Sequence, residues 1–333
     1  MDNLIVFNDE QLRVAANLRQ YYDAWRSAKR DAAQLTGYMA WKTVKGRQYL
    51  YRLTDTKGNG TSLGPRTAET EARFAAFTRS REQIASRVKG ASEQLEITGA
   101  LYRSLHLGAI ASPAAAILRE ADVRGMLGRD LLVVGTSALA AYEIEASCRF
   151  AIGMDATEDF DLTWAAARDE SVALLTDQRA PVLAMLKAVD DSYVVNTERP
   201  FKARNRTAFA VEILLAPSVA DGYPRTEPLR PVPLPEQDWL LAGRRVDQVV
   251  CGRDGTAARV VAPDPRWFAL QKCWLSHKPG RDPLKVRKDW RQGLALLEVI
   301  RAGRLPQHPL DAAFIAGLPD DLQRYATEAF RRA

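Results

Sequence analysis

The spacing of apolar and polar positions changes along the chain, and each change predicts a different element. Between residues 9 and 35 the apolar side chains recur at helical spacing, which predicts an amphipathic helix. Residues 38–53 hold two short aromatic runs around a Lys-Gly-Arg turn, a pattern typical of a β-hairpin. The glycines of residues 55–64 predict a loop, and a second long helix is expected to run to about Leu107. The first third of the chain is therefore predicted to be helical with one hairpin.

Short apolar runs and turn signals alternate through the middle of the chain. Residues 113–128 read as a helix, and the run at residues 131–134 is fit for a buried strand. The same reasoning predicts a helix from about 138 to 143, strands at 159–162, 194–195 and 209–215, and a helix at 170–188. A proline-rich loop is expected at 217–235, and helices from 263 to the end. These elements predict an α+β fold with a mixed sheet and flanking helices.

Three regions follow from this pattern. We predict an N-terminal helix and hairpin region at 1–110, a central domain at 111–262 and a C-terminal helical subdomain at 263–333. Three cysteines lie far apart in the 333 residues and are expected to be reduced thiols. The first residues lack a basic stretch and a long apolar core, and no segment is long and apolar enough for a membrane span. We therefore expect a cytoplasmic protein that is not bound to a membrane.

The charge is distributed unevenly between these regions. Residues 1–130 hold 20 Lys and Arg against 14 Asp and Glu, residues 131–262 hold 14 against 19, and residues 263–333 hold 13 against 8. The total is +6. Basic flanks suit a polyanionic partner and an acidic centre suits metal ions. The alternative is that the basic character reflects only an Arg-rich and Ala-rich proteome.

Three acidic residues stand on two of the predicted strands. Asp159 and Asp161 are two positions apart, so both side chains project from the same face of a strand. Glu212 lies between apolar residues, where a carboxylate is costly unless it is paired or binds a cation. Three carboxylates on one sheet face are hard oxygen ligands that suit Mg²⁺ or Mn²⁺. The alternative for Glu212 is a buried ion pair, with Arg204 or Arg206 as partner.

A small-residue turn precedes these acids. Gly135 ends the buried strand, and a glycine lets the backbone approach a ligand closely. Thr136 and Ser137 then lead into the helix, whose N-terminus can receive phosphate oxygens. Taken alone, a Gly-Thr-Ser turn is usually only a turn and a helix cap.

Together these segments resemble the nucleotidyltransferase superfamily, which has the polymerase-beta-like fold. The match consists of Val134-Gly135-Thr136-Ser137, Asp159-Phe160-Asp161-Leu162 and Val211-Glu212-Ile213, and the resemblance covers about residues 125–300. Within the superfamily the chain looks similar to uncharacterised bacterial nucleotidyltransferase-like members and to toxin-type enzymes. The third acid is a glutamate where an aspartate is commoner.

The resemblance implies a Mg²⁺-dependent enzyme that moves a nucleoside monophosphate from an NTP, such as ATP, to an acceptor hydroxyl. In that reading Asp159, Asp161 and Glu212 are the catalytic and metal-binding residues. The implied phosphate-binding residues are Gly135, Thr136, Ser137 and Lys272. Arg281 and Lys285 are secondary candidates, with a solvated basic face as the alternative.

The acceptor stays open between RNA, such as a tRNA end, and a protein hydroxyl or a small molecule. Aromatic and basic residues interleave in the hairpin region, which could stack bases and neutralise phosphates. The alternative is that these aromatics form the core of the hairpin itself. A rival to the enzyme is a catalytically silent module of the same fold that binds nucleic acid or a partner protein.

Overall fold

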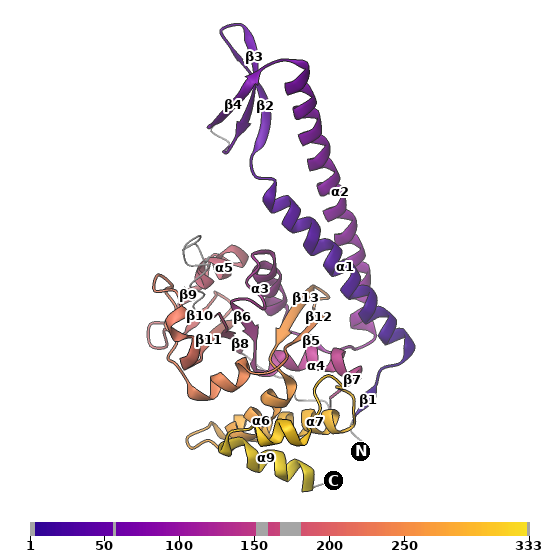
Figure 1. Ribbon diagram of the computed structural model, residues 1–333, viewed down its shortest axis with the longest axis vertical. Coiled ribbons are helices and arrows are strands. Elements are labelled where there is room, and N and C mark those ends of the chain that lie inside the picture. Colours follow the sequence, from indigo (N-terminus) through magenta and orange to yellow (C-terminus); the bar gives the residue numbers. More distant parts are fainter. Residues whose placement is uncertain (1–3, 56–57, 151–158, 167–180, 332–333) are drawn as a thin grey trace. The chain divides into compact units, whose positions relative to one another are not determined.

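The computed structural model describes residues 4–55, 58–150, 159–166 and 181–331. The chain divides into two compact units, which are described separately. The larger unit contains residues 1–19 and 98–333, and the smaller unit contains residues 20–97 (Figure 1). No helix among the described residues is long and apolar enough to cross a membrane.

The smaller unit consists of two helices and a three-stranded antiparallel sheet. Its helices belong to α1 (Asp9–Gln34) and α2 (Ala68–Ser104), and an ion pair of 2.7 Å between Arg87 and Asp31 joins them. The strands are β2 (Tyr38–Val44), β3 (Arg47–Leu53) and β4 (Gly60–Pro65), in that order. The predicted helices and the hairpin are confirmed.

The predicted loop at 55–64 is wrong over its second half, which forms β4. Gly60 explains the difference, because a Cβ at this position would lie 2.1 Å from the carbonyl oxygen of Arg52. Glycine is needed at position 60 because two backbones approach closely within the sheet, and it does not mark a loop there.

A five-stranded sheet forms the centre of the larger unit. Its order is β6 (Leu131–Val133), β8 (Asp159–Trp164), β11 (Ala210–Leu215), β10 (Lys202–Arg204) and β9 (Val194–Val195). Strands β8 and β11 are parallel, whereas the other neighbouring pairs are antiparallel. One face is apolar and fully buried, with Phe160 and Leu162 beside Val211 and Ile213. The strand predictions at 131–134, 159–162, 194–195 and 209–215 are confirmed, while β10 was not predicted.

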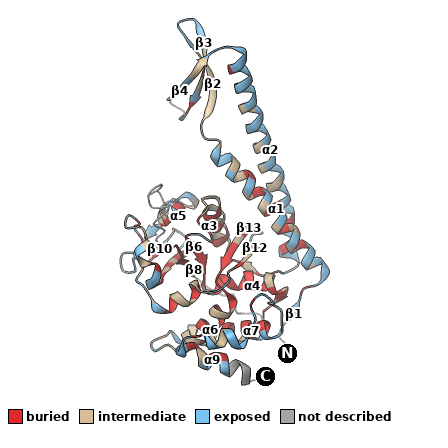
Figure 2. Ribbon diagram, viewed as in Figure 1, coloured by how far each residue is buried: buried red, intermediate tan, exposed pale blue. Residues whose placement is uncertain are grey.

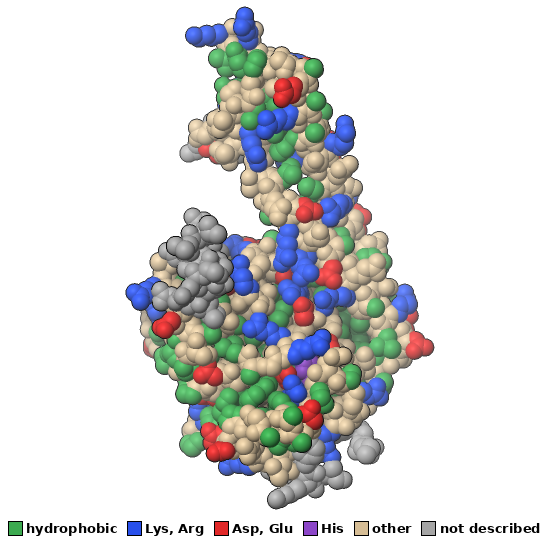
Figure 3. All heavy atoms as spheres, in the orientation of Figure 1, with side chains coloured by type: hydrophobic (Ala, Val, Ile, Leu, Met, Phe, Trp, Pro, Cys, Tyr) green, Lys and Arg blue, Asp and Glu red, His purple; other side chains and the backbone are tan. Residues whose placement is uncertain are grey.

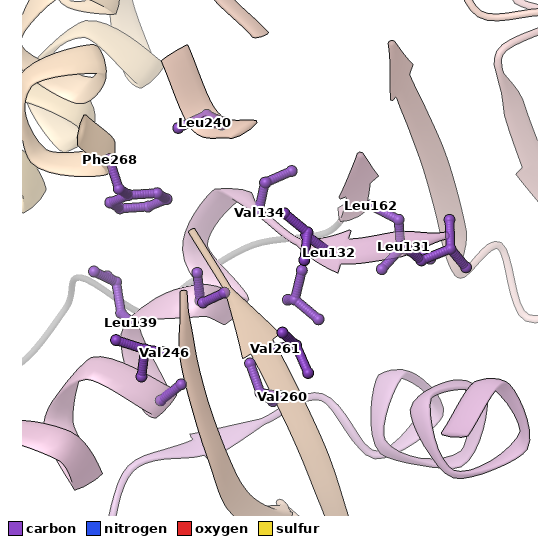
Figure 4. Packing of buried hydrophobic residues seen from close by; sticks show 14 of the residues in the cluster. Leu131, Leu132, Val134, Leu139, Leu162, Leu240, Val246, Val260, Val261 and Phe268 are labelled. Carbon is purple, nitrogen blue, oxygen red and sulfur yellow. The ribbon is translucent and has the colours of Figure 1, made fainter. Parts of the chain in front are cut away.

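A second sheet was also missed by the sequence pattern. Strands β12 (Val246–Gly252) and β13 (Ala257–Ala262) are antiparallel, and β5 (Ala109–Ile110) pairs with β12. Helices α3 (Ser112–Val123) and α4 (Leu139–Ala146) pack against this sheet. Figure 4 shows Leu132 close to Val260 and Val261, so the two sheets share one core.

The C-terminal part is helical, as predicted. Helices α6 (Pro265–Leu275), α7 (Pro283–Arg301), α8 (Ala312–Ala316) and α9 (Asp320–Arg331) follow the prolines. Asp264 and Asp282 cap α6 and α7 by accepting backbone N–H bonds of 2.9 Å. Helices α6 and α7 approach closely at Gly293, where a Cβ would lie 2.5 Å from Sγ of Cys273.

The remaining elements are short. Helix α5 (Val182–Val189) forms the last part of the helix predicted at 170–188. The first part of that prediction lies outside the described residues. The predicted proline-rich loop contains two 3₁₀ helices, η2 (Pro217–Gly222) and the start of η3 (Pro235–Leu241). Strand β1 (Ile5–Val6) pairs with β7 (Cys148–Arg149).

All three cysteines are free and buried, as expected for reduced thiols. Buried residues concentrate on the sheets, α3 and α4 of the larger unit (Figure 2).

Candidate active site

The three predicted acids lie on one face of the central sheet. Strand register places Glu212 of β11 directly beside Asp161 of β8, and Asp159 is two residues before Asp161 on the same face. The apolar residues that alternate with them are buried on the opposite face, so the hydrophobic pattern fixes the direction of the carboxylates. The side chains of Asp159 and Glu212 are 24% and 17% exposed. The acids therefore form a partly covered, strongly negative patch.

A lysine that the sequence reading did not single out completes this patch. Lys202 on β10 is the cross-strand partner of Glu212. Its Nζ donates to Oδ1 of Asp159 at 2.7 Å and to Oε1 of Glu212 at 2.8 Å. The expected ion-pair partners of Glu212 were Arg204 and Arg206, but the observed cation is Lys202, and Arg206 pairs with Asp191 at 3.1 Å. Lys202 begins a strand of only three residues, which is too short to show an alternation of apolar and polar positions. The sequence pattern therefore did not reveal this strand or its lysine.

The glycine turn contacts the central acid. Gly135 begins the 3₁₀ helix η1 (Gly135–Ala138) with φ +64°, which is the left-handed region that favours glycine. A Cβ on Gly135 would lie 2.1 Å from Oδ2 of Asp161, and the backbone N–H of Val134 donates to the carbonyl oxygen of Asp161 at 3.1 Å. The carboxylate of Asp161 therefore packs directly against the turn.

Thr136 and Ser137 are buried in the same turn. The side chain of Gln292, fully buried on α7, donates to Oγ1 of Thr136 at 3.3 Å. This bond connects the turn to the C-terminal helices. The turn and α7 thus belong to one site although they are far apart in sequence.

Lys272 on α6 has an acidic partner of its own. Its Nζ donates to Oδ1 of Asp289 at 2.7 Å, and both side chains are buried. Arg281 donates to Oδ2 of the same carboxylate at 2.6 and 2.9 Å. The predicted site residue Lys272 is therefore held by a protein carboxylate in this structure, and the carboxylate belongs to α7.

The positive charges of α6 and α7 influence the acidic patch electrostatically. The pKa of Asp161 is raised to about 7, chiefly by burial and also by the neighbouring carboxylates of Glu212 and Asp159, against the lowering effect of Lys272 and Lys285. Burial also lowers the pKa of Lys288, with repulsion from Lys272 as the next cause. The positive charges of Lys272 and Lys285 therefore act on Asp161 from α6 and α7.

The raised pKa of Asp161 predicts how stability depends on pH. The folded carboxyl keeps its proton up to about pH 7, whereas an unfolded aspartate loses it near pH 4. The folded state therefore binds more protons between these values, and the free energy of unfolding without metal falls as the pH rises from 4 to 7. Three pKa units correspond to about 4 kcal/mol, and we expect ~2 kcal/mol because the carboxyl is partly exposed to solvent.

Urea unfolding at several pH values, in EDTA, measures this fall. Asp161→Asn is the matched control, because it removes the titrating group and keeps the size of the side chain. A fall of the same size in wild type and Asp161→Asn would contradict the assignment.

A second prediction concerns the stability of the α6–α7 pair. Replacing Lys272 by Met keeps the apolar stem but removes the charge that faces Asp289. Breaking a buried pair costs about 3–5 kcal/mol, and we expect ~2–3 kcal/mol because Arg281 still bonds the carboxylate. The measurement is urea unfolding without ligand. An unchanged free energy of unfolding would show that the pair with Asp289 does not form.

The acidic patch offers only part of a closed site for a divalent ion. In the part of the chain that the structure describes, no three Asp, Glu, His or Cys side chains enclose a metal position. Lys202 instead bonds two of the three acids. The donor chemistry nevertheless fits a hard cation, because three carboxylates share the face and their mutual repulsion contributes to the raised pKa of Asp161.

A family model described as nucleotidyltransferase matches residues 112–315, which include the acidic patch, the glycine turn and the α6–α7 pair. No curated protein and no solved structure matches the chain.

Proposed function

The chain belongs to the nucleotidyltransferase family and is therefore a transferase, and on that premise we propose its reaction. We propose that it transfers a nucleoside monophosphate from an NTP to an acceptor hydroxyl. The acceptor oxygen forms a bond to the α-phosphorus, the bond to the β-phosphate breaks, and pyrophosphate leaves. The observation that carries this proposal is the register of Asp161 beside Glu212, with Gly135 packed against Asp161.

The acidic patch would hold the metal that this reaction needs. Asp159, Asp161 and Glu212 are the candidate ligands for Mg²⁺ or Mn²⁺. When bound, the ion makes the acceptor hydroxyl more acidic and neutralises charge on the phosphates. Glu212 would receive the proton of the acceptor hydroxyl, and its partial exposure of 17% supports this role.

The turn and the C-terminal helices would hold the phosphates. The backbone of Gly135, Thr136 and Ser137 offers N–H groups at the start of η1 and α4, which suits phosphate oxygens. Lys272 and Lys285 lie close enough to Asp161 to shift its pKa, so their charge also acts on a triphosphate bound there. These groups position the NTP and offset the charge that develops on the leaving pyrophosphate.

Metal dependence of NTP binding separates this enzyme from a silent module of the same fold. The experiment measures the affinity for each NTP by calorimetry, with Mg²⁺ and with EDTA. We expect binding with Mg²⁺ and a large loss in EDTA, because the phosphates would then face three carboxylates without a bridging cation. Equal affinity in both buffers, or no binding in either, would favour the silent module.

The smaller unit is the candidate for acceptor binding. It holds 14 Lys and Arg against 8 Asp and Glu, so the whole net charge of +6 belongs to these residues. Basic side chains gather at its tip over the sheet of β2, β3 and β4 (Figure 3). This charge supports an RNA acceptor, since phosphates dominate affinity for nucleic acids.

The aromatic residues of this unit support a different role. Trp41 packs against Phe74 with ring centroids 5.8 Å apart, and the guanidinium of Arg66 lies 5.2 Å above Trp41. Trp41 is therefore half-buried and packed within the unit, which favours the alternative that the sequence left open. We propose that the acceptor is held mainly through phosphates, not by stacking on Trp41.

This proposal predicts the effect of two exposed cations at the hairpin turn. Replacing Lys45 and Arg47 together by Gln should weaken binding of total tRNA by about tenfold at low salt, because two phosphate contacts are lost. The measurement is a filter-binding titration, and the double replacement of Lys187 and Arg225, exposed in the larger unit, is the charge-matched control. Equal RNA affinity in wild type and the hairpin variant would show that Lys45 and Arg47 do not belong to the acceptor site.

A further inference from the structure

We propose that the ammonium of Lys202 occupies part of the metal site as a fixed positive charge. Because of this charge, the site binds only one divalent ion until the nucleotide is bound. This inference rests on the proposed function and adds to it a residue that positions two of the candidate ligands. Three side chains carry the argument from adjacent strands, in the order Lys202, Glu212 and Asp161.

The reach of Lys202 is unusual. Strand β10 pairs with β11 and not with β8, yet its ammonium bonds Asp159 of β8 at 2.7 Å. The side chain therefore crosses β11 on the acidic face. Ala210 is the β11 residue beside Asp159, and it projects from the same face as Glu212 two positions later. Its small side chain leaves the room through which the ammonium reaches Asp159.

The environment of Lys202 excludes the ordinary role of a solvated surface lysine. Its side chain is only 4% exposed, and lysines are almost never this buried unless they are paired. Both of its bonds go to carboxylates that are themselves partly covered. Lys202 is therefore fixed within the acidic patch, between two of the side chains that would bind a metal.

The charges then decide how many ions the patch takes. When all three carboxylates are ionised, they and one ammonium leave a net charge of −2, which one divalent cation neutralises. The bonds of Lys202 go to Asp159 and Glu212, which leaves Asp161 as the carboxylate that a first ion would bind. A second ion would enter with the triphosphate, which brings its own negative charge.

The test is calorimetric titration of the full-length protein with Mn²⁺ in the absence of nucleotide. We expect one Mn²⁺ per chain in wild type. Lys202→Met should bind Mn²⁺ at least tenfold more tightly or take a second ion, and its melting temperature should respond to Mn²⁺ more strongly than that of wild type. Lys202→Arg should keep the stoichiometry of one, and Lys187→Met, a neutralisation at an exposed site of α5, should behave as wild type.

A second variant keeps every charge. Ala210→Val fills the space over β11 and separates the ammonium from Asp159, so Mn²⁺ should again bind more tightly, even where Lys202→Met fails to fold. Unchanged Mn²⁺ affinity and stoichiometry in whichever of these variants fold would overturn the role of Lys202 while leaving the metal site intact. Absence of Mn²⁺ binding in every protein, wild type included, would overturn the metal-dependent function itself, and this inference with it.

Discussion

Replacing Asp161 by Asn is expected to lower nucleotidyl transfer by about 10³-fold or more while making the metal-free protein more stable. Activity is expected to fall because Asp161, the candidate metal ligand beside Glu212, loses its charge. Stability rises at pH 8 by ~2 kcal/mol, because wild type must hold an ionised Asp161 in a covered position beside two other carboxylates. Initial rates with Mg²⁺ and urea unfolding in EDTA measure the two effects.

Asp159→Asn is the matched comparison. It should lose activity to a similar extent, but it should lower the stability of the metal-free protein, because Asp159 is bonded to the buried Lys202. The two aspartates are identical in chemistry and two residues apart, so opposite effects on stability would come only from their different partners. A loss of stability in both variants would contradict the account of Asp161, and a gain in both would contradict the pair with Lys202.

Replacing Gly135 by Ala is expected to remove activity and to destabilise the protein by about 2–4 kcal/mol. The added Cβ would lie 2.1 Å from Oδ2 of Asp161, and φ of +64° is itself unfavourable for alanine. The carboxylate must then move away from the turn, so the geometry of the ligand is lost together with the fit of the backbone.

The matched control for Gly135 is Gly125→Ala. Gly125 has a similar φ of +69°, but a Cβ there meets nothing within 4 Å. It therefore isolates the cost of backbone strain from the clash with Asp161. Circular dichroism melts and transfer rates measure both variants, and equal losses of activity at the two glycines would contradict a specific contact between Gly135 and Asp161.

The acids of the site were predictable because local rules determine their positions. Asp159 and Asp161 alternate with Phe160, and the burial of that phenyl ring decides which way the carboxylates face. Glu212 was visible as a charge inside an apolar run. The glycine turn was visible because it follows a short apolar strand. Each signal lies within a few residues of the group that it identifies.

Lys202 and Asp289 were not predictable in the same way, because their roles depend on pairing across the fold. Lys202 acquires its role only from the sheet order, which places β11 between β10 and β8, so that one lysine on β10 reaches acids on both β11 and β8. Asp289 meets Lys272 because α6 and α7 pack closely at Gly293. Strands β12 and β13 were missed although the sequence carries a hairpin signal, Asp254-Gly255, between their apolar runs.

Transfer of labelled phosphate measures the central claim most directly. Purified protein is incubated with Mg²⁺, total RNA and cell lysate, and with NTPs labelled at either the α- or the γ-phosphate. The account predicts that label from the α-phosphate becomes covalently attached to a macromolecule, that label from the γ-phosphate leaves as pyrophosphate, and that Asp161→Asn abolishes both. Covalent label from the γ-phosphate, or equal labelling by wild type and Asp161→Asn, would contradict it.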